Sequence, residues 1–403
     1  MNHFLRLAVA LGLITAVGPF AIDMYLPALP SIGASLNASP NAVQATLMAF
    51  FIVFGICQLF YGPLADIVGR KLPIYGGLAL FAVGSVGCAL SGDVQTLIGF
   101  RIVQSLGACA GMVVPRAIVR DLHTGPEATK LMSMLMLVMS VSPILAPSIG
   151  SFVIAAFGWR GVFWVLTGAA AIAIALATFV LEETRPAEAR RGSSWIGAFR
   201  SYGTLLKDRE FIGLTMVGGF GISSFFAYLG SASFVLIDHY GLTPNEFSLC
   251  FSLNAAAFFG FSQLTGLLTK RFGLPSVIRT ASAGMALVMA ITAGLVLAGA
   301  DGLPVMIVGL FVGYGFLGLV LPTSAVLSLE KHGAVAGTAS ALSGALQMIV
   351  GAAIMAFGGL FGNATAKPMI ATIAVAAVLA WATTLVSVRR APVTKAAAAH
   401  SQG

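Results

Sequence analysis

One carboxylate stands inside a long apolar stretch near the N-terminus. Asp23 is the only acidic residue between positions 7 and 65, and Pro19 and Pro27 flank it, each four residues away. Two prolines so close together remove backbone hydrogen bonds, so we expect a broken or kinked helix around the carboxyl group. An acid buried there favours its neutral form and could take up and release a proton near neutral pH. The competing interpretation is an acid at the outer end of a helix that simply touches water.

A second charge, Arg101, falls within another apolar stretch. At helical spacing it shares one face with Gln104, Ala108 and Met112, so this face is polar at one end and open along its length. We expect the face to line a cavity, with Arg101, Gln104 and Met112 as wall residues. Alternatively, Arg101 anchors the loops at the end of its helix.

The amino-acid composition indicates the class of protein in which these two charges must be positioned. Lys and Arg number 22 and Asp and Glu number 14, so only 9% of the 403 residues are charged, whereas 58% are hydrophobic. An ordinary soluble domain carries roughly 25% charged residues. This composition excludes a soluble enzyme, a disordered chain and a secreted domain built on disulfides. The apolar surface must therefore face lipid. Placing one charged side chain at the centre of a bilayer costs from about 3 kcal/mol upward.

Other kinds of chemistry have no support in the sequence. The net charge of +8 does not indicate a nucleic-acid partner, because the basic residues are scattered between apolar stretches. The four cysteines follow no metal-binding or redox spacing, and HExxH, GxSxG and phosphate-binding GxxxxGK[ST] motifs do not occur. We therefore expect no enzyme activity, no cofactor and no metal, and any uphill transport would need an ion gradient.

Twelve apolar stretches are each long enough, at about 20 residues, to cross a bilayer core of ~30 Å. They lack the alternation of polar and apolar residues that is typical of barrel strands. The first stretch continues past Asp23 without a signal-peptide cleavage site, so we expect it to be retained as a helix. With the N-terminus in the cytoplasm, 19 Lys and Arg side chains fall on the cytoplasmic side and 2 on the other. The sequence thus predicts an all-α polytopic membrane protein with both termini cytoplasmic. The spans are 5–28, 42–62, 73–91, 96–118, 130–154, 161–181, 211–236, 246–268, 276–298, 304–328, 336–360 and 368–388.

The chain carries an internal repeat. A shift of 204 residues superposes Pro40–Asn41 on Pro244–Asn245 and Gly69 on Gly273, which indicates duplication of a six-helix unit. We expect a first half (1–181), a cytoplasmic linker (182–210), a second half (211–390) and a cytoplasmic tail (391–403). Two such halves are typical of a transporter that rocks around a central site. A duplication that serves packing alone is the alternative. Asp23 falls on an alanine in the repeat, which favours a function for this acid rather than a scaffold role.

The loop after the second span carries a family motif. Residues 62–71 read GPLADIVGRK, which resembles the signature loop of the major facilitator superfamily. Together with the segments below, it is similar to the Bcr/CflA branch of drug:proton antiporters. These segments are 23–30 (DMYLPALP), 101–108 (RIVQSLGA), 115–121 (PRAIVRD), 142–150 (SPILAPSIG) and 157–160 (FGWR).

The resemblance implies export of small, often amphipathic drugs in exchange for protons. It assigns proton coupling to Asp23 and a coupling or cavity role to Arg101. The motif of the fifth span is associated with antiporters, and here it comprises Pro143, Ala146, Pro147 and Gly150. Three small residues depart from the family's glycines: Ser105, Ala146 and Ser151.

The signature loop also has a physical interpretation as a cytoplasmic gate. Asp66 lies at the end of the second span and could face the positive N-terminus of the eleventh span, near 333–337. Arg70 could pair with Asp121 at the end of the fourth span. These contacts would hold the cytoplasmic face shut and break on switching. The expected gate residues are Gly62, Asp66, Gly69, Arg70, Lys71 and Asp121.

We therefore expect a proton-coupled multidrug exporter of the bacterial cytoplasmic membrane, acting as a monomer with a small-molecule substrate, protons and the lipid bilayer as partners. The alternative is a proton-coupled exporter of a metabolite such as an amino acid, and a more remote one is a membrane sensor or scaffold without transport. Aromatic side chains could supply the walls of a substrate cavity: Phe20, Tyr25, Phe50, Phe51, Phe225, Tyr228 and Tyr314.

Overall fold

The computed structural model describes residues 3–123, 125–190, 194–362 and 365–388, so the expected tail 391–403 lies outside the described residues. These residues form helices and connecting turns, without a β-strand among them. The helices are α1 (His3–Asp23), α2 (Leu29–Ser35), α3 (Pro40–Val68), α4 (Lys71–Leu90), α5 (Val94–Leu122), α6 (Gly125–Val180), α7 (Ala187–Arg190), α8 (Trp195–Lys207), α9 (Arg209–Ser233), α10 (Pro244–Phe272), α11 (Leu274–Leu297), α12 (Leu303–Leu329), α13 (Ala336–Gly359) and α14 (Ala366–Ser387), with short helical turns at η1 (Leu26–Ala28), η2 (Phe234–His239) and η3 (Gly333–Val335).

Eleven helical stretches of the described chain are long and apolar enough to cross a membrane. One of them, Lys130–Val180, has 51 residues, which at helical rise would measure roughly 77 Å, more than twice a bilayer core. Gly158 interrupts it with φ 71° and ψ 178°, a conformation that glycine adopts readily and that lets the chain turn back. This stretch therefore makes two spans, and the predicted twelve-span architecture is confirmed.

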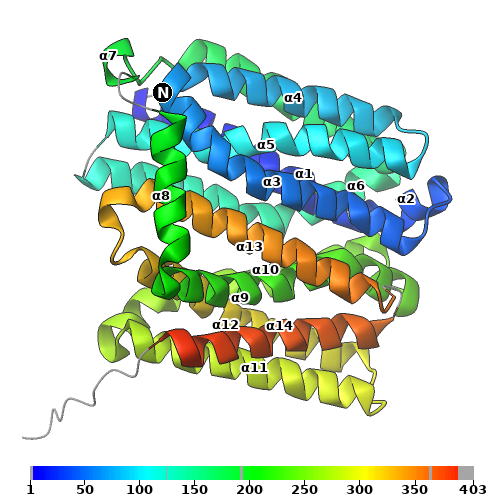
Figure 1. Cartoon of the computed structure of the whole chain (residues 1–403). Coiled ribbons are helices and arrows are strands. Elements are labelled where there is room, and N and C mark those ends of the chain that lie inside the picture. The colour runs from blue at the N-terminus through cyan, green and yellow to red at the C-terminus, as the bar shows by residue number, and fades with distance from the viewer. Residues whose placement is uncertain (1–2, 124, 191–193, 363–364, 389–403) are drawn as a thin grey trace, which may run out of the picture.

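The spans form two bundles, which lie one above the other in Figure 1. Helices α1–α6 pack against one another, and α9–α14 do the same. The bundles meet chiefly where α3 packs against α13 and α6 against α10. The first and last described residues lie at the same end of the molecule as α7 and α8, which we call the linker end (Figure 1).

The internal repeat is visible in the helices themselves. The bounds of α3 and α10 differ by 204 residues at both ends. Each helix starts with a hydroxyl cap, from Ser39 or Thr243, which accepts a hydrogen bond from a free backbone N–H of the first turn. Each ends at a glycine of positive φ, Gly69 at 98° and Gly273 at 77°, where a side chain would be strained. The same start and stop signals thus produce the same span in both halves.

Close helix packing in the first half depends on single glycines. A Cβ added at Gly84 of α4 would come within 2.4 Å of the backbone nitrogen of Gln104 on α5. On the same helix, a Cβ added at Gly76 would meet nothing within 4 Å. Gly84 therefore lets the backbone of α4 approach that of α5, as small residues do at membrane helix interfaces.

We predict that Gly84→Ala destabilises the protein by about 1–3 kcal/mol, because overpacking forces the two helices apart. Gly76→Ala is the matched control on the same helix, and it should be neutral or slightly stabilising because alanine favours helix. Thermal unfolding of both purified variants in detergent measures the difference. Equal melting temperatures would show that α4 and α5 do not need this close approach.

Candidate functional site

The first span breaks at its acidic residue. Helix α1 ends at Asp23, a short turn covers Leu26–Ala28, and α2 then continues toward the end of the span. The Asp23 side chain is buried, with 5% of the residue exposed. Its carboxylate accepts a hydrogen bond of 3.4 Å from the Ser142 hydroxyl on α6. The predicted break is present, and the structure does not support the alternative of an acid in contact with water.

The motif of the fifth span lies against this break. A Cβ added at Gly150 would come within 2.4 Å of the Met24 carbonyl oxygen, so only glycine permits α6 to pass so close. Ala146 is fully buried, and Pro143 and Pro147 lie within the helix. The structure therefore brings Asp23, Ser142 and Gly150 together. Sequence reasoning did not single out Ser142, although it directly precedes the first proline of the motif.

Arg101 is fully buried but is not paired with an acid in the described part of the chain. Its Nη1 donates to Gln104 Oε1 at 2.6 Å and to the Ala21 carbonyl at 3.1 Å. The guanidinium carbon lies 4.5 Å and 4.4 Å from the ring centroids of Tyr25 and Phe50, which is a cation–π arrangement. Arg101 is thus held by two aromatic rings, an amide and a carbonyl.

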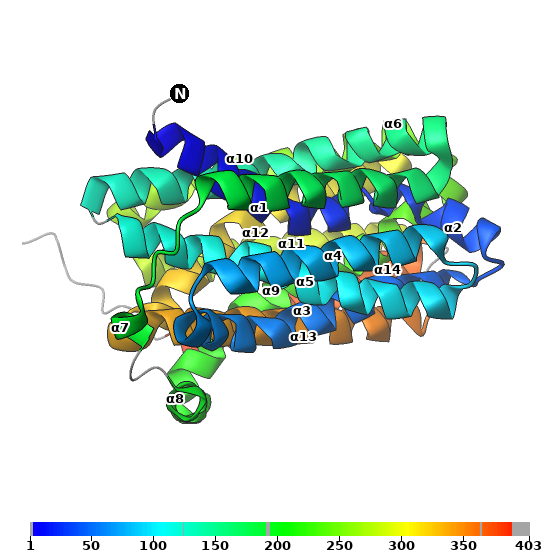
Figure 2. The ribbon, with the colours of Figure 1, turned by 90° about the horizontal axis from the view of Figure 1, so that it is seen from above.

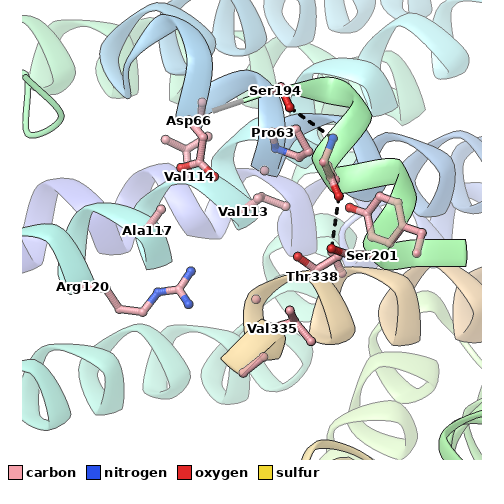
Figure 3. Close-up of a pocket in the computed structure, with 18 of the residues that line it drawn as sticks. Pro63, Asp66, Val113, Val114, Ala117, Arg120, Ser194, Ser201, Val335 and Thr338 are labelled. Carbon is pink, nitrogen blue, oxygen red and sulfur yellow. Dashed lines mark hydrogen bonds between the residues drawn. The ribbon is translucent and has the colours of Figure 1, made fainter. Parts of the chain in front are cut away.

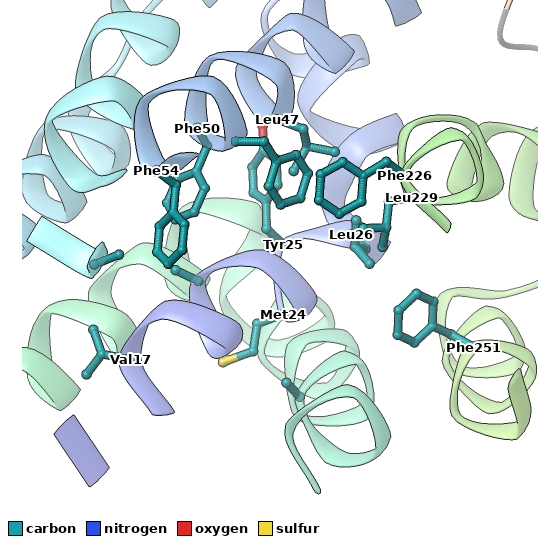
Figure 4. Close-up of a cluster of buried hydrophobic side chains, with 14 of the residues drawn as sticks. Val17, Met24, Tyr25, Leu26, Leu47, Phe50, Phe54, Phe226, Leu229 and Phe251 are labelled. Carbon is teal, nitrogen blue, oxygen red and sulfur yellow. The ribbon is translucent and has the colours of Figure 1, made fainter. Parts of the chain in front are cut away.

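The predicted cavity face is covered in this structure. Tyr25 and Phe50 are buried, and Figure 4 shows both rings inside the cluster of hydrophobic side chains rather than around a cavity. Gln104 donates to the Ser85 hydroxyl at 2.8 Å, which joins α5 to α4. Met112 is half-buried against the same core. These residues therefore build a polar network inside the first half.

Three of the predicted aromatic side chains gather in the second half. The Tyr314 ring lies 5.7 Å from the centroids of both Phe225 and Tyr228. Phe225 and Tyr314 line an apolar cavity of about 90 Å³ together with Pro143 of α6. Asn254 donates to the Tyr228 hydroxyl at 3.2 Å. This cavity lies where the halves meet, but in this conformation it is too small for a drug-sized molecule.

The signature loop forms an ion-pair network at the linker end. Arg70 Nε donates to Asp121 at 2.7 Å, its Nη2 donates to the same carboxylate at 3.2 Å, and its Nη1 donates to Asp66 at 2.9 Å. The predicted pair of Arg70 and Asp121 is therefore present, and it is bidentate, the strongest geometry for such a pair. Gly62, Asp66 and Arg70 also line a large cavity.

The linker supplies further members of this network, which sequence reasoning missed. Glu183 accepts backbone hydrogen bonds from Arg70 at 2.8 Å and from Lys71 at 3.2 Å, so it caps the start of α4. Arg185 pairs with Asp66 at 3.2 Å, and Thr184 donates to Asp121 at 3.0 Å. The signal in the sequence is the dense group of charged residues directly after the sixth span, a segment predicted above only as a cytoplasmic linker.

The pKa of Glu183 lies below its usual range. Burial acts to raise this pKa, but hydrogen bonds from the backbone N–H groups of Arg70, Arg185 and Lys71, together with the nearby Arg190 guanidinium, outweigh burial. The carboxylate is thus held in its charged form. Its contribution to stability is present above about pH 4.3, the value for an unfolded chain, and is lost as the pH falls through the folded-state pKa.

A cavity of about 590 Å³ separates the halves at the linker end. Asp66 of α3 and Arg120 of α5 line it on one side, and the segment 333–338 at the start of α13 lines it on the other (Figure 3). Residues of α8 line a third side. The expected approach of Asp66 to the start of the eleventh span is therefore not made in this structure, because the cavity lies between them. The Arg70–Asp121 pair, which we expected to hold the cytoplasmic face shut, lies within the first half and is formed while the cavity is open.

At the opposite end, hydroxyl groups join the two halves. Ser233 donates to the Leu26 carbonyl at 2.6 Å, Ser252 donates to the Ile144 carbonyl at 2.7 Å, and the Ser151 and Ser248 hydroxyls lie 2.7 Å apart. The bundle is thus open at the linker end and closed at the other, with the break at Asp23 close to the closed end.

We predict that Glu183→Gln loosens the linker. A hydrogen bond to a charged group contributes about 1.5 kcal/mol or more, so trypsin should cut after Arg190, which pairs with Glu183 at 3.6 Å, roughly tenfold faster in the variant. The neighbouring Glu182→Gln is the matched control, since no contact of Glu182 was found in the described chain, and it should leave the rate unchanged. Equal rates in both variants would contradict the capping role of Glu183.

Comparison with known proteins identifies the family. The Major Facilitator Superfamily matches residues 11–356. The uncharacterized MFS-type transporter YdgK of Bacillus subtilis is 36% identical over 377 residues, 93% of each chain. The bicyclomycin resistance protein homolog of Haemophilus influenzae is 29% identical and covers 92% of each chain. Multidrug resistance protein D of Escherichia coli is 31% identical over 85% of this chain and 86% of its own.

The names of the last two relatives agree with the resemblance to the Bcr/CflA branch that the motifs indicated. The family match covers most of both six-helix halves, and the transmembrane architecture excludes an enzyme of ordinary soluble type. The chain belongs to the Major Facilitator Superfamily and is a multi-pass transporter of the bacterial inner membrane.

Proposed function

We propose that this transporter exports small amphipathic compounds, drugs among them, in exchange for protons. The observation that carries the proposal is the single carboxyl group buried at the break of the first span, between α1 and the antiporter motif of α6. A buried acid of this kind marks a proton pathway in membrane proteins. The drug-resistance names of two relatives favour drugs as the substrate class.

The proposed cycle uses the two ends of the bundle alternately. A compound enters from the linker end, where the halves stand apart around the cavity of about 590 Å³. The halves 1–181 and 211–390 then rock about the contacts of α3 with α13 and of α6 with α10. A proton that arrives from the outside neutralises Asp23, favours release of the compound and resets the carrier.

Asp23 and Arg101 have different roles in this proposal. The guanidinium of Arg101 is bound to the Ala21 carbonyl, two residues before Asp23, and to the ring of Tyr25, two residues after it. Arg101 thus contacts the backbone on both sides of the break without forming an ion pair with the acid. A change of charge at Asp23 alters the field at Arg101 and the packing of the break, which couples the proton to the rocking motion.

Closure of the linker end is proposed to bring Asp66 to the start of α13. In the open form Asp66 is bound by Arg70 and Arg185, across the cavity from 333–338. When the halves approach, the carboxylate can interact with the free backbone N–H groups at the start of that helix. The ion-pair network therefore holds the gate residue in place while the cavity is open.

We predict that Asp23→Asn abolishes transport driven by a pH gradient, because the amide cannot bind or release a proton at this position. Vesicles with an imposed gradient measure this, using a compound found by resistance profiling in a strain without its own efflux pumps. Exchange of the compound down its own gradient should persist, which separates loss of coupling from loss of folding.

Asp93→Asn is the matched control for the change at Asp23. Asp93 is an exposed cap of α5, where it accepts hydrogen bonds from Thr96. This variant should keep gradient-driven transport. Unchanged gradient-driven transport by Asp23→Asn would remove this carboxyl group from the mechanism. The same assay, run over drugs and amino acids, distinguishes a drug exporter from a metabolite exporter.

We predict that Asp66→Asn abolishes transport while insertion into the membrane stays normal. The neutral side chain loses its ion pairs with Arg70 and Arg185 and its attraction to the start of α13. Membrane content is measured by quantitative immunoblot and transport in the same vesicles. Full transport by the variant would contradict a gating role for this residue.

A further inference from the structure

Helix α8 differs from every other long helix of the described chain. It lies in the linker, and its polar and apolar side chains are separated around the helix. One face packs on the protein through Tyr202 and Leu205, which are buried. The neighbouring face is apolar and exposed: Ile196 is 82%, Phe199 45% and Leu206 51% exposed.

The orientation of α8 is that of a helix lying in a membrane surface. In Figure 1 it runs across the spans at the linker end rather than along them. Figure 2 shows it nearly end-on and outside the bundle, beside α3 and α13. A helix placed there meets the bilayer at the level of the lipid headgroups, because the adjacent spans carry the hydrocarbon-facing surface.

The exposed apolar face continues onto a span. Phe60 of α3 is 41% exposed, and its ring lies 6.1 Å from that of Trp195 and 5.7 Å from that of Phe199. A Phe at this position of a spanning helix faces acyl chains. The aromatic side chains of α8 therefore extend the lipid-facing surface of α3 around the linker end, with the interfacial residue types expected there.

Basic side chains border the same face. On a helical wheel, Ile196, Phe199 and Leu206 fall within a sector of about 80°. Arg200 and Lys207 lie beside this sector, on the side away from the protein. Both are exposed, and no ion pair of either was found in the described chain. This order, with a protein face, an apolar face and then a basic edge, is that of an interfacial helix on anionic lipid.

Helix α8 also contacts both halves. The Tyr202 hydroxyl donates to the Leu59 carbonyl of α3 at 3.0 Å. The buried faces of Tyr202 and Leu205 share a cluster with Phe211, at the start of α9, and with Leu342 of α13. A force on α8 therefore acts on the first and second halves together, at the end where the cavity is open.

We propose that α8 lies in the headgroup region, with its apolar face in the acyl boundary, and that Arg200 and Lys207 bind the headgroups of anionic phospholipids. The occupant is lipid rather than a second protein, because the apolar face is continuous with the lipid-facing surface of α3. The bound lipid fixes the position of α8 against both halves and so biases the opening of the linker end.

The first test measures the depth of α8 in the full-length protein. Single cysteines replace Ile196 or Thr204 in a background without the four native cysteines, and each carries a spin label. Thr204 is exposed and lies about 80° around the helix from Ile196, beyond the basic edge. In vesicles of phosphatidylcholine and phosphatidylglycerol, the Ile196→Cys label should collide with oxygen more than with a nickel chelate, and the Thr204→Cys label the reverse. Equal access to nickel at both positions, or dipolar broadening from a second copy at position 196, would overturn the proposal.

The second test measures the charge dependence. Raising the phosphatidylglycerol content of phosphatidylcholine vesicles should move the Ile196→Cys label deeper. Arg200→Gln with Lys207→Gln should weaken this response by roughly fivefold for each charge lost. The matched control, Lys270→Gln with Arg271→Gln, removes two exposed charges at the end of α10 and should leave the response intact. An unchanged response in the first pair, or a response that both pairs lose equally, would refute headgroup binding by α8.

Neither test depends on transport, so a failure here leaves the proposed antiport untouched.

Discussion

The structure depends on the burial of one carboxyl group and one guanidinium in an apolar bundle without an ion pair between them. A charge in lipid costs from about 3 kcal/mol upward, so each group needs its own polar surroundings. Asp23 obtains them from the hydroxyl of Ser142 and from the end of a broken helix. Arg101 obtains them from two aromatic rings, an amide and the carbonyl of Ala21. The arrangement at Asp23 requires α6 to approach the break closely, which Gly150 allows.

At the linker end, where water is available, the charged groups are bound in ion pairs rather than by uncharged partners. Its network is ionic, and its members come from three separate parts of the chain: the loop after α3, the end of α5 and the first residues of the linker. The linker is therefore a structural part of this ion-pair network and more than a tether between halves. Helix α8 continues this role along the outer edge of the cavity.

Much of this architecture could be predicted from the sequence, because few kinds of backbone structure can cross a lipid bilayer. Apolar length fixes the spans, and prolines at four residues' distance from Asp23 predict the break. The pair of Arg70 and Asp121 followed from a motif. The capping role of Glu183 could not be predicted, since it depends on how the linker folds back onto Arg70, 113 positions earlier in the chain. The covering of Arg101 by Tyr25 and Phe50 depends on side-chain packing between three helices, which periodicity does not encode. The contact expected between Asp66 and the eleventh span depends on which end of the bundle is open.

The closed end is held by apolar packing and by hydrogen bonds of a modest kind. Besides apolar contacts such as the stack of Phe51 on Phe226 at 4.2 Å, serine hydroxyls that meet carbonyls or one another link the halves there. Such bonds contribute about 1 kcal/mol each on balance, and water can take the place of either partner. Separation of the halves at that end exchanges one set of hydrogen bonds for another at small net cost, whereas the apolar side chains shared by the halves need new apolar contacts. A ligand or a proton shifts the populations of two conformations only through its different affinities for them, and a differential of a few kcal/mol is enough to invert those populations.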